Sequence, residues 1–431
     1  MDMDKIKLIE ELKENPIYAM SLGGKELFHS NILAWLLMRK NNNPIKKIFC
    51  IEEQEVVLNV FRERQNLDLI VVYANKEELE KEGVHEEQYL ETFDDPDSYL
   101  PNDEGWKHHS CFDKLKFIII ENKFKSIPEQ KQLAEYSAKL KGKKIKVYKR
   151  IVKINKTRCC LFAPDCVLDN AFGLSANNLE DPYTIEGVDW EKVTYEQYNQ
   201  NLAELVDDSK EGNIIGYYKD MLSKLLDILS DWLKDDFKNK SSTPDKENIE
   251  LLKQIRFYDI YTKLWYGITQ KRIEEKFADL KKQPDRRFFG MTRSFGLCEW
   301  QYEYNEILLV GVQIQNTSFR VFVEPYYEKK PKDKYMFKPG VDNEDEFKGL
   351  ILEWGNSIIN KAFEDVDSKN SKEPEYKCLR FGDFKYVQRV LPENTGIEQL
   401  ASMVCNAMKQ MTTENIEKLS TKIDDFLIYD K

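Results

Sequence analysis

The pattern of hydrophobic positions divides the first half of the chain into predicted helices and strands. Apolar residues that recur every three or four positions predict helices at 4–14, 25–37, 129–140, 193–206 and 214–233. Short runs of apolar and β-branched residues predict strands at 54–63, 67–73, 117–123 and 159–165. Between the second and third of these strands lies a polar stretch, about 76–110, that is dominated by acidic residues. We expect this stretch to be an exposed insertion.

The pattern changes after a polar stretch at 239–248, whose composition is typical of a linker. One long helix is predicted over 249–278, and helices near 344–365 and 397–425 end the chain. Between them, strands are predicted at 298–304, 307–314 and 318–325. Strict alternation in the first of these strands predicts one buried and one solvated face. We therefore predict a mixed α/β domain over 1–240 and an α+β domain with an antiparallel meander over 245–431.

Composition excludes several classes of protein. The 431 residues are 41% hydrophobic and 33% charged, so the chain can bury a core and is neither collagen-like nor fully disordered. No segment approaches the ~20 apolar residues that span a bilayer, and the charged start does not resemble a signal peptide. We expect a cytoplasmic protein with no membrane association. The eight cysteines form no C-x-x-C pair, which predicts reduced thiols.

Charged side chains interrupt two of the predicted strands. Asp68 lies in LDLIVVY, and Glu121 and Lys123 lie in FIIIENK. Because side chains alternate along a strand, Glu121 and Lys123 should share one face while Asn122 points to the other. If the two strands are neighbours, the two carboxylates converge and favour a divalent cation such as Mg²⁺. The alternative is a Glu–Lys ion pair with no further role.

Polar side chains also open one face of the helix at 25–37. Glu26, His29 and Ser30 are spaced i, i+3 and i+4, and the same face continues with leucines. A capping arrangement at the start of the helix is the alternative explanation. In the helix at 129–140, Gln132 and Tyr136 form an i, i+4 pair, which on its own is typical of a surface.

A basic stretch follows this helix. Residues 139–158 contain many lysines and arginines, among them Lys143, Lys144 and Lys146, and no acidic residue. The stretch is either a solvated face or a surface that follows a phosphate backbone. The net charge of −11 argues against a protein that coats nucleic acid in bulk, but it allows a local basic groove.

In chain order, these motifs resemble those of the PD-(D/E)xK nuclease superfamily. The resemblance is greatest to bacterial members with an E-x-x-H-S helix followed by L-A-W-L-L. The matching segments are ELFHSNILAWLL, LDLIVV, IIIENKFKS and QLAEY. They cover about residues 20–140 and, more loosely, the helices up to 235. Leu67 stands where the family signature has proline.

The resemblance implies a restriction-endonuclease-like core with a mixed central β-sheet flanked by helices. It also implies that Asp68, Glu121 and the backbone carbonyl of Asn122 bind the metal, with Glu26 joining directly or through water. Lys123 would orient or activate the attacking water, or stabilise the charge that develops on the phosphate.

Further residues would support this site or hold the nucleic acid. By resemblance these are Gln132, Tyr136, His29 and Ser30, and by charge Lys143, Lys144 and Lys146. The chemical roles of His29 and Ser30 are not specified by the resemblance.

The implied activity is Mg²⁺-dependent hydrolysis of phosphodiester bonds, with Mn²⁺ able to substitute. DNA is expected as the substrate in preference to RNA, in bacterial defence or DNA repair. Two alternatives stay open: a catalytically silent nucleic-acid-binding or sensor module with the same fold, and an RNase that uses the same site. The second domain is expected to recognise nucleic acid, an effector, a partner protein or another copy of the chain.

Overall fold

The computed structural model divides into two compact units. The first comprises Met1–Trp232 and Leu251–Phe257, and the second comprises Leu233–Glu250 and Tyr258–Lys431. The residues that the structure describes are 3–21, 26–86, 113–128, 130–148, 150–169, 183–234, 246–276, 287–288, 297–304, 307–325, 334–341, 344–364, 378–381, 384–392, 395–411 and 413–430.

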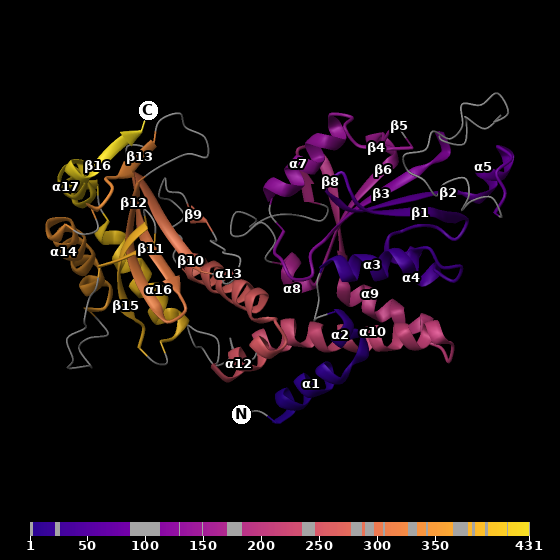
Figure 1. Cartoon of the computed structure of the whole chain (residues 1–431), viewed down its shortest axis with the longest axis horizontal. Helices are drawn as coiled ribbons and strands as arrows, with labels where there is room; N and C mark the ends of the chain where they lie inside the picture. Colours follow the sequence, from indigo (N-terminus) through magenta and orange to yellow (C-terminus); the bar gives the residue numbers. More distant parts are fainter. Residues whose placement is uncertain are drawn as a thin grey trace. The chain divides into compact units, whose positions relative to one another are not determined.

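A six-stranded mixed sheet forms the centre of the first unit (Figure 1). Its strands, in spatial order, are β1 (Glu55–Arg64), β2 (Leu67–Asn75), β3 (Lys116–Asn122), β6 (Thr157–Ala163), β8 (Val188–Thr194) and β7 (Tyr183–Ile185). β1, β2 and β3 are antiparallel neighbours, β3, β6 and β8 run parallel, and β7 pairs antiparallel with β8. The predicted mixed sheet is therefore confirmed.

Helices cover both faces of this sheet (Figure 1). The unit contains α1 (Met3–Glu14), α2 (Pro16–Ser21), α3 (Glu26–Leu37), α4 (Asn43–Ile48), α7 (Gln130–Lys141), α9 (Tyr195–Leu202) and α10 (Lys210–Asp227). Helix α7 lies on one face of the sheet and α3 and α9 lie on the other, whereas α10 packs on α9, and α1 and α2 pack on α10. On the α7 face, the indole nitrogen of Trp190 donates to Ser137 Oγ at 3.0 Å. On the opposite face, Phe162 stacks on Tyr195 of α9 with ring centroids 4.0 Å apart. Buried aromatic packing thus fixes both helical layers to the strands.

Shorter elements connect the main ones. They are α5 (Lys76–Lys81), the pair β4 (Lys146–Val147) and β5 (Arg150–Ile151), the 3-10 turns at Ile154–Lys156 and Ala203–Leu205, α8 (Asp165–Leu168) and a π turn at Ile228–Trp232. Leu79 and Val84 are buried, so the first residues of the predicted insertion pack on the core. The rest of that insertion, from residue 87 to 112, lies outside the described residues.

An antiparallel sheet forms the centre of the second unit. In spatial order its strands are β14 (Cys378–Phe381), β15 (Phe384–Val390), β12 (Ser318–Pro325), β11 (Leu308–Gln315), β10 (Cys298–Tyr304) and β9 (Arg287–Phe288). The unit also contains α13 (Tyr258–Lys276), α14 (Asp345–Ala362), α16 (Ile397–Gln410), α17 (Thr413–Ile423), the 3-10 turn at Asp424–Phe426, and the pair β13 (Lys334–Phe337) and β16 (Leu427–Asp430). The three strands predicted at 298–304, 307–314 and 318–325 form the meander β10–β11–β12.

Two predicted long helices are wrong, because each is interrupted. The helix predicted at 249–278 consists of α12 (Lys246–Gln254) and α13. Arg256 between them has a left-handed φ of 56°, and Phe257 N–H donates back to Leu252 O at 2.9 Å. This is the hydrogen-bond pattern that ends helices. The helix predicted at 397–425 likewise divides into α16 and α17.

The expected solvated face of β10 is also wrong. Glu299 and Gln301 are both buried, although they alternate with the apolar positions. Glu299 Oε2 accepts a hydrogen bond from Gln313 on the neighbouring strand at 2.8 Å. Burial raises the pKa of Glu299 to about 7. Both faces of this part of β10 are therefore buried, one with apolar side chains and the other with polar ones.

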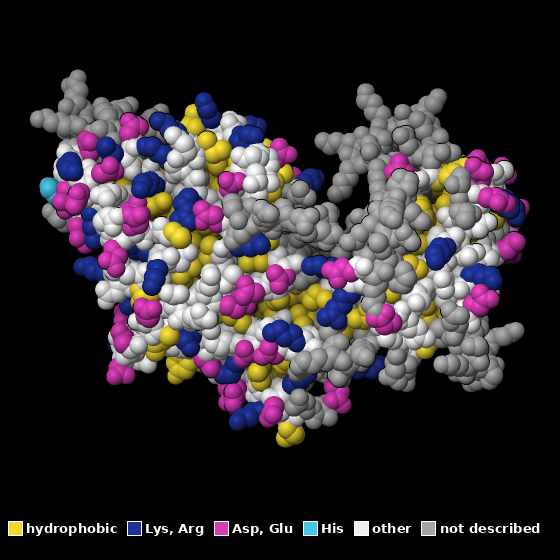
Figure 2. Space-filling view, turned by 180° about the vertical axis from the view of Figure 1, so that it is seen from behind, with side chains coloured by type: hydrophobic (Ala, Val, Ile, Leu, Met, Phe, Trp, Pro, Cys, Tyr) yellow, Lys and Arg dark blue, Asp and Glu magenta, His cyan; other side chains and the backbone are white. Residues whose placement is uncertain are grey.

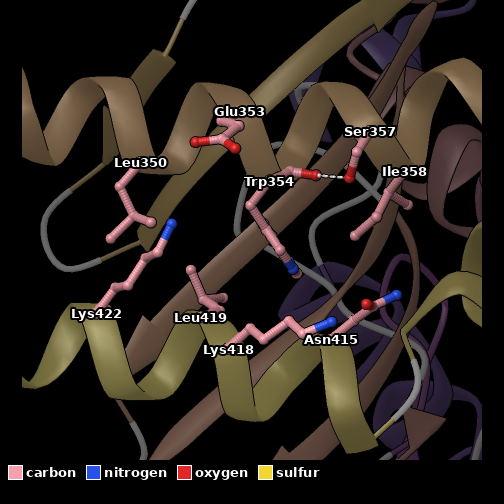
Figure 3. A pocket seen from close by; sticks show the side chains of 9 residues that line it. All are labelled: Leu350, Glu353, Trp354, Ser357, Ile358, Asn415, Lys418, Leu419 and Lys422. Carbon is pink, nitrogen blue, oxygen red and sulfur yellow. Dashed lines mark hydrogen bonds between the residues drawn. The ribbon is translucent and has the colours of Figure 1, made fainter.

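A pocket of about 230 Å³ lies between α14 and α17 of the second unit (Figure 3). Leu350, Trp354 and Leu419 give it apolar walls, and Lys418 and Lys422 line it from α17. The described part of the second unit thus contains a hollow of its own, on elements that carry none of the predicted site residues.

Candidate active site

Two acidic residues occupy matching ends of neighbouring strands. Asp68 is the second residue of β2, and Glu121 is the next-to-last residue of β3. The strands are antiparallel, and Leu69 is paired with Ile120, one position further into the sheet. Asp68 and Glu121 therefore lie beside each other on the two strands, at the same end of the β2–β3 ladder. The structure brings them together as the sequence predicted.

Glu121 is an enclosed carboxylate, with only 1% of its surface exposed. Its Oε1 atom accepts hydrogen bonds from Gln132 Nε2 at 2.7 Å and from Lys123 Nζ at 2.8 Å. Its Oε2 atom is buried and has no hydrogen-bond partner among the described residues. Burial, with a smaller contribution from the nearby charge of Asp68, raises the pKa of Glu121 to about 7 even though Lys123 opposes the shift.

Lys123 follows directly after the strand. Its backbone N–H donates to Phe162 O of β6 at 2.8 Å, which fixes the backbone at this end of the sheet. Burial alone would lower the pKa of Lys123, but Glu121, Glu26 and Asp68 together raise it. The amine is therefore a fixed cation beside the two acids.

Asn122 points away from Glu121 and anchors β3 to the opposite helical layer. Its side-chain amide donates to Ser30 Oγ at 2.9 Å and to Glu26 O at 3.1 Å, and Tyr195 OH donates to its Oδ1 at 2.7 Å. Its backbone N–H donates to Asp68 Oδ2 at 2.8 Å. One residue thus holds α3, α9 and the carboxylate of β2 in place, a role that the sequence analysis did not identify.

Asp68 is partly buried and keeps a raised pKa. Burial is the largest cause, and the charges of Glu26 and Glu63 add to it, while the Asn122 hydrogen bond and Lys123 oppose it. Both strand acids therefore hold protons more tightly than free carboxyls do, because burial makes their ionised forms unfavourable. A bound cation would stabilise the ionised forms.

The Glu26 carboxylate contacts the loop after Lys123. Its Oε1 atom accepts hydrogen bonds from Lys125 N–H at 3.1 Å and from Ser126 Oγ at 2.6 Å. Glu26 therefore ties the first turn of α3 to this loop. In this arrangement its best-defined contacts are structural, and its predicted place in a metal shell stays a prediction.

His29 and Ser30 are both fully enclosed. His29 Nδ1 lies 2.9 Å from Tyr218 OH, and the imidazole packs on Phe124 with ring centroids 4.1 Å apart. Burial lowers the pKa of His29 to about 3, so the ring is neutral at physiological pH. These two residues support the site from inside the core, and where they lie they have no surface to offer a nucleic acid.

Gln132 and Tyr136 extend the site along α7. Gln132 Nε2 contacts Tyr136 OH at 2.8 Å as well as Glu121. One turn further, Lys139 Nζ lies 5.3 Å from the Tyr136 ring centre and donates to Gln65 O at 3.4 Å. The pair that looked typical of a surface is thus the start of a polar stripe between Glu121 and the β1–β2 turn.

The predicted basic side chains lie beyond this stripe. Lys143, Lys144 and Lys146 are exposed. The backbone of Lys146 exchanges hydrogen bonds with the side chain of Gln65, at 2.7 Å and 3.2 Å. These hydrogen bonds connect the basic stretch to the turn of the β1–β2 hairpin, a few residues before Asp68. Tyr148, which lies within the basic stretch, is buried with its ring against Phe61, so the lysines rather than this aromatic ring form the exposed surface.

A segment from beyond the linker completes the surroundings of the site. Ile255 and Phe257 are fully buried, and Ile255 O accepts a hydrogen bond from Tyr18 OH at 2.9 Å. Phe257 packs on Phe124 edge to face, and Lys125 Nζ lies 4.8 Å above its ring. Sequence reasoning missed this contact because nothing in the sequence pattern links residues so far apart along the chain.

The donor set fits a small hard cation. Among the described residues, no three Asp, Glu, His or Cys side chains gather closely enough to form a metal cluster by themselves. Two carboxylates do converge, and one buried carboxylate oxygen lacks a partner. Mg²⁺ commonly takes one or two carboxylates and fills the rest of its shell with water. Asp68 and Glu121 could hold such an ion.

Comparison with known proteins agrees with this geometry. Residues 15–221 match the family model of the PD-(D/E)XK nuclease superfamily. No curated protein and no solved structure matches the chain. Within the described residues, no helix has the length and apolar character needed to cross a membrane. The matched region, residues 15–221, contains the mixed sheet and both strand acids, and in this region the chain is similar to the PD-(D/E)XK nuclease superfamily.

Proposed function

We propose that this protein is a Mg²⁺-dependent nuclease that hydrolyses phosphodiester bonds in DNA, with Mn²⁺ able to replace Mg²⁺. The observation that carries the proposal is the buried, partnerless Oε2 atom of Glu121 beside Asp68 and Lys123. A purely structural ion pair would not need a second strand acid at the same edge of the sheet. A cation would balance the surplus negative charge.

The proposed roles of the site residues are metal binding, stabilisation of negative charge and orientation of the metal-binding acids. Asp68, Glu121 and the backbone carbonyl of Asn122 hold the metal, and Glu26 joins through water or by leaving its loop contacts. When bound, the ion neutralises phosphate charge and makes a water molecule a better nucleophile. Lys123 supplies a fixed positive charge where negative charge develops on the phosphate. Gln132 keeps Glu121 in orientation through its 2.7 Å hydrogen bond, and Tyr136 supports Gln132 in turn.

We infer the wider role from the resemblance of the sequence motifs to those of bacterial nucleases. This resemblance supports a role in defence or DNA repair, with the cytoplasm as the site of action. The two units support a domain division close to the predicted one, except that 251–257 belongs with the nuclease. The second unit would then supply recognition of nucleic acid, an effector, a partner protein or a second copy.

A cleavage assay tests the proposal. Plasmid DNA, single-stranded DNA and RNA are each incubated with the full chain in Mg²⁺, Mn²⁺ or EDTA. We expect DNA cleavage with either metal, none in EDTA, and none with Lys123→Ala. Equal cleavage by wild type and Lys123→Ala would overturn the proposal. Cleavage of RNA alone would favour an RNase, and metal-independent binding without cleavage would favour a silent binding module.

A further inference from the structure

A groove lies beside the paired acids, between α3 and the end of the β1–β2 hairpin. It has a volume of about 830 Å³ and is lined by Leu27, Asn31, Val60, Phe61, Arg62, Glu63, Arg64 and Gln65. We call this set the hairpin groove. All of these residues precede Asp68. Leu27 and Asn31 lie in the helix segment ELFHSNILAWLL, whereas the residues of the hairpin lie outside the segments that carry the family resemblance.

The groove lies beside Asp68 along the β1–β2 ladder. In the β1–β2 ladder, Arg62 is paired with Leu69 and Arg64 with Leu67. The two arginines therefore stand on either side of Glu63, which also lines the groove and is close enough to Asp68 to affect its pKa. Leu27 follows Glu26 on α3 and is 48% exposed, which leaves an apolar contact at the opposite wall.

The arginines are arranged to meet an anion. Arg62 Nη1 donates to Asn31 Oδ1 at 2.6 Å, which orients an otherwise exposed guanidinium toward α3. The Arg64 guanidinium lies 6.0 Å from the centre of the Phe61 ring. Guanidinium groups held in this way match the geometry of phosphate oxygens. Glu63 lies between them in sequence and is close enough to Asp68 to raise its pKa, so the positive charge is local rather than uniform.

The groove continues into the basic stretch. Gln65 at the hairpin turn receives Lys139 Nζ on its carbonyl and pairs with the backbone of Lys146. Basic groups thus border this end of the sheet on the α3 side and on the α7 side. Elsewhere, acidic and basic side chains are interspersed over the face shown in Figure 2. Because the chain as a whole carries a charge of −11, attraction of a polyanion has to come from a local arrangement of this kind.

We propose that the hairpin groove binds the sugar-phosphate backbone of the nucleic-acid strand next to the phosphate that is cleaved, with Arg62 and Arg64 contacting phosphate oxygens. This inference rests on the proposed nuclease function and adds the path of the substrate. A polyanionic strand is the occupant that charge complementarity and continuity with the paired acids favour.

Equilibrium binding tests the inference without depending on cleavage. Fluorescein-labelled single-stranded and double-stranded DNA are titrated with the full chain in EDTA at several salt concentrations. We compare wild type, Arg62→Gln/Arg64→Gln, and a control, Lys7→Gln/Lys210→Gln, which removes two exposed charges on α1 and α10. Melting curves confirm that each variant is folded, and Arg62→Lys keeps the charge while removing the planar fork.

The expected result is a loss of affinity of 10-fold or more in the arginine variant, with the control unchanged. The slope of log affinity against log salt should decrease by about 0.7 to 0.9 for each phosphate that the variant no longer neutralises. Arg62→Lys should fall in between. Equal affinity and slope in the arginine variant and the control would overturn the inference.

The two proposals fail in distinguishable ways. If wild type cleaves DNA and the arginine variant binds normally, the groove is wrong and the nuclease stands. If DNA binding depends on the arginines but no metal supports cleavage, the nuclease is wrong and the groove stands. If wild type binds neither form of DNA, the groove is wrong.

Discussion

The ammonium group of Lys123 lies 2.8 Å from Oε1 of Glu121, and only 11% and 1% of the two side chains are exposed. Replacing Lys123 by Met should abolish cleavage and leave a buried carboxylate without its counter-charge. Removing one partner of a buried pair costs about 3–5 kcal/mol of unfolding free energy. The loss should be large at pH 8 and small at pH 5.5, where Glu121 is protonated. Urea unfolding in EDTA at both pH values measures the loss of unfolding free energy. Equal losses at the two pH values would contradict an ion pair between Lys123 and Glu121.

The raised pKa of Glu121 predicts an unusual dependence of stability on pH. Between its ordinary value of 4.5 and about 7, the folded state keeps a proton that the unfolded chain has released. Stability of the metal-free protein should therefore fall as pH rises through this window, by about 3 kcal/mol, and then level off. Added Mg²⁺ should restore stability mainly above pH 7, where Glu121 is ionised.

Glu299 in the second unit has a pKa raised to about the same value, so it contributes in the same direction. Two controls separate the groups. Glu121→Gln should remove the stabilisation by Mg²⁺ together with part of the pH dependence. Glu299→Gln should remove only pH dependence. Melting temperatures from pH 4.5 to 8.5, with and without Mg²⁺, distinguish these outcomes.

Replacing Asp68 by Asn should separate activity from folding. The side-chain oxygen of Asn can still accept the hydrogen bond from Asn122 N–H, while the repulsion from Glu26, Glu63 and Glu121 disappears. We expect no cleavage and a free energy of unfolding equal to that of wild type or higher by about 1 kcal/mol in EDTA. A marked drop in melting temperature would show that Asp68 is chiefly structural.

Glu26 can be tested by comparing two substitutions. Glu26→Gln keeps an oxygen acceptor for Lys125 N–H and Ser126 Oγ, whereas Glu26→Ala removes it. If Glu26 acts only through the loop, Gln should retain stability and most activity, and Ala should cost about 1–2 kcal/mol. If Glu26 joins the metal shell, Gln should lose Mn²⁺ affinity while staying as stable as wild type. Mn²⁺ titration followed by electron paramagnetic resonance reads out the difference.

Phe257 should matter to the nuclease although it lies outside the matched family region. Phe257→Ala removes the contact with Phe124 and opens a cavity, at a cost of about 3–5 kcal/mol, and Phe257→Leu should cost less. A chain that ends at residue 240 should lack the same contact and be less stable than the full protein. Equal melting temperatures for the first unit in the shortened and full chains would refute this role.

Sequence reasoning succeeded where local pattern and side-chain chemistry agree. The strands that carry Asp68 and Glu121 are continuous apolar runs, so an acid within them stands out and its face follows from alternation. The sequence analysis expected the two acids to converge if their strands are neighbours, and the β2–β3 ladder shows that they are. The roles of these acids remain predictions until cleavage is measured.

Other features depended on contacts that no local pattern encodes. Asn122 looked like the passive residue between Glu121 and Lys123, yet its four hydrogen bonds join three elements. The break at Arg256 was hidden because no glycine or proline marks it. Alternation predicted that Glu299 and Gln301 face solvent, yet both are buried. Whether the polar face of a strand is covered depends on the elements that pack on the sheet, and alternation within the strand does not reveal them.

The return of the chain at Ile255–Phe257 brings the covalent connection between the two units close to the site. Helix α13 of the second unit begins at Tyr258, the residue directly after Phe257. The ring of Phe257 touches Phe124, which follows Lys123 in the sequence. The path of the chain from the paired acids to the second unit therefore runs through one aromatic contact and one peptide bond.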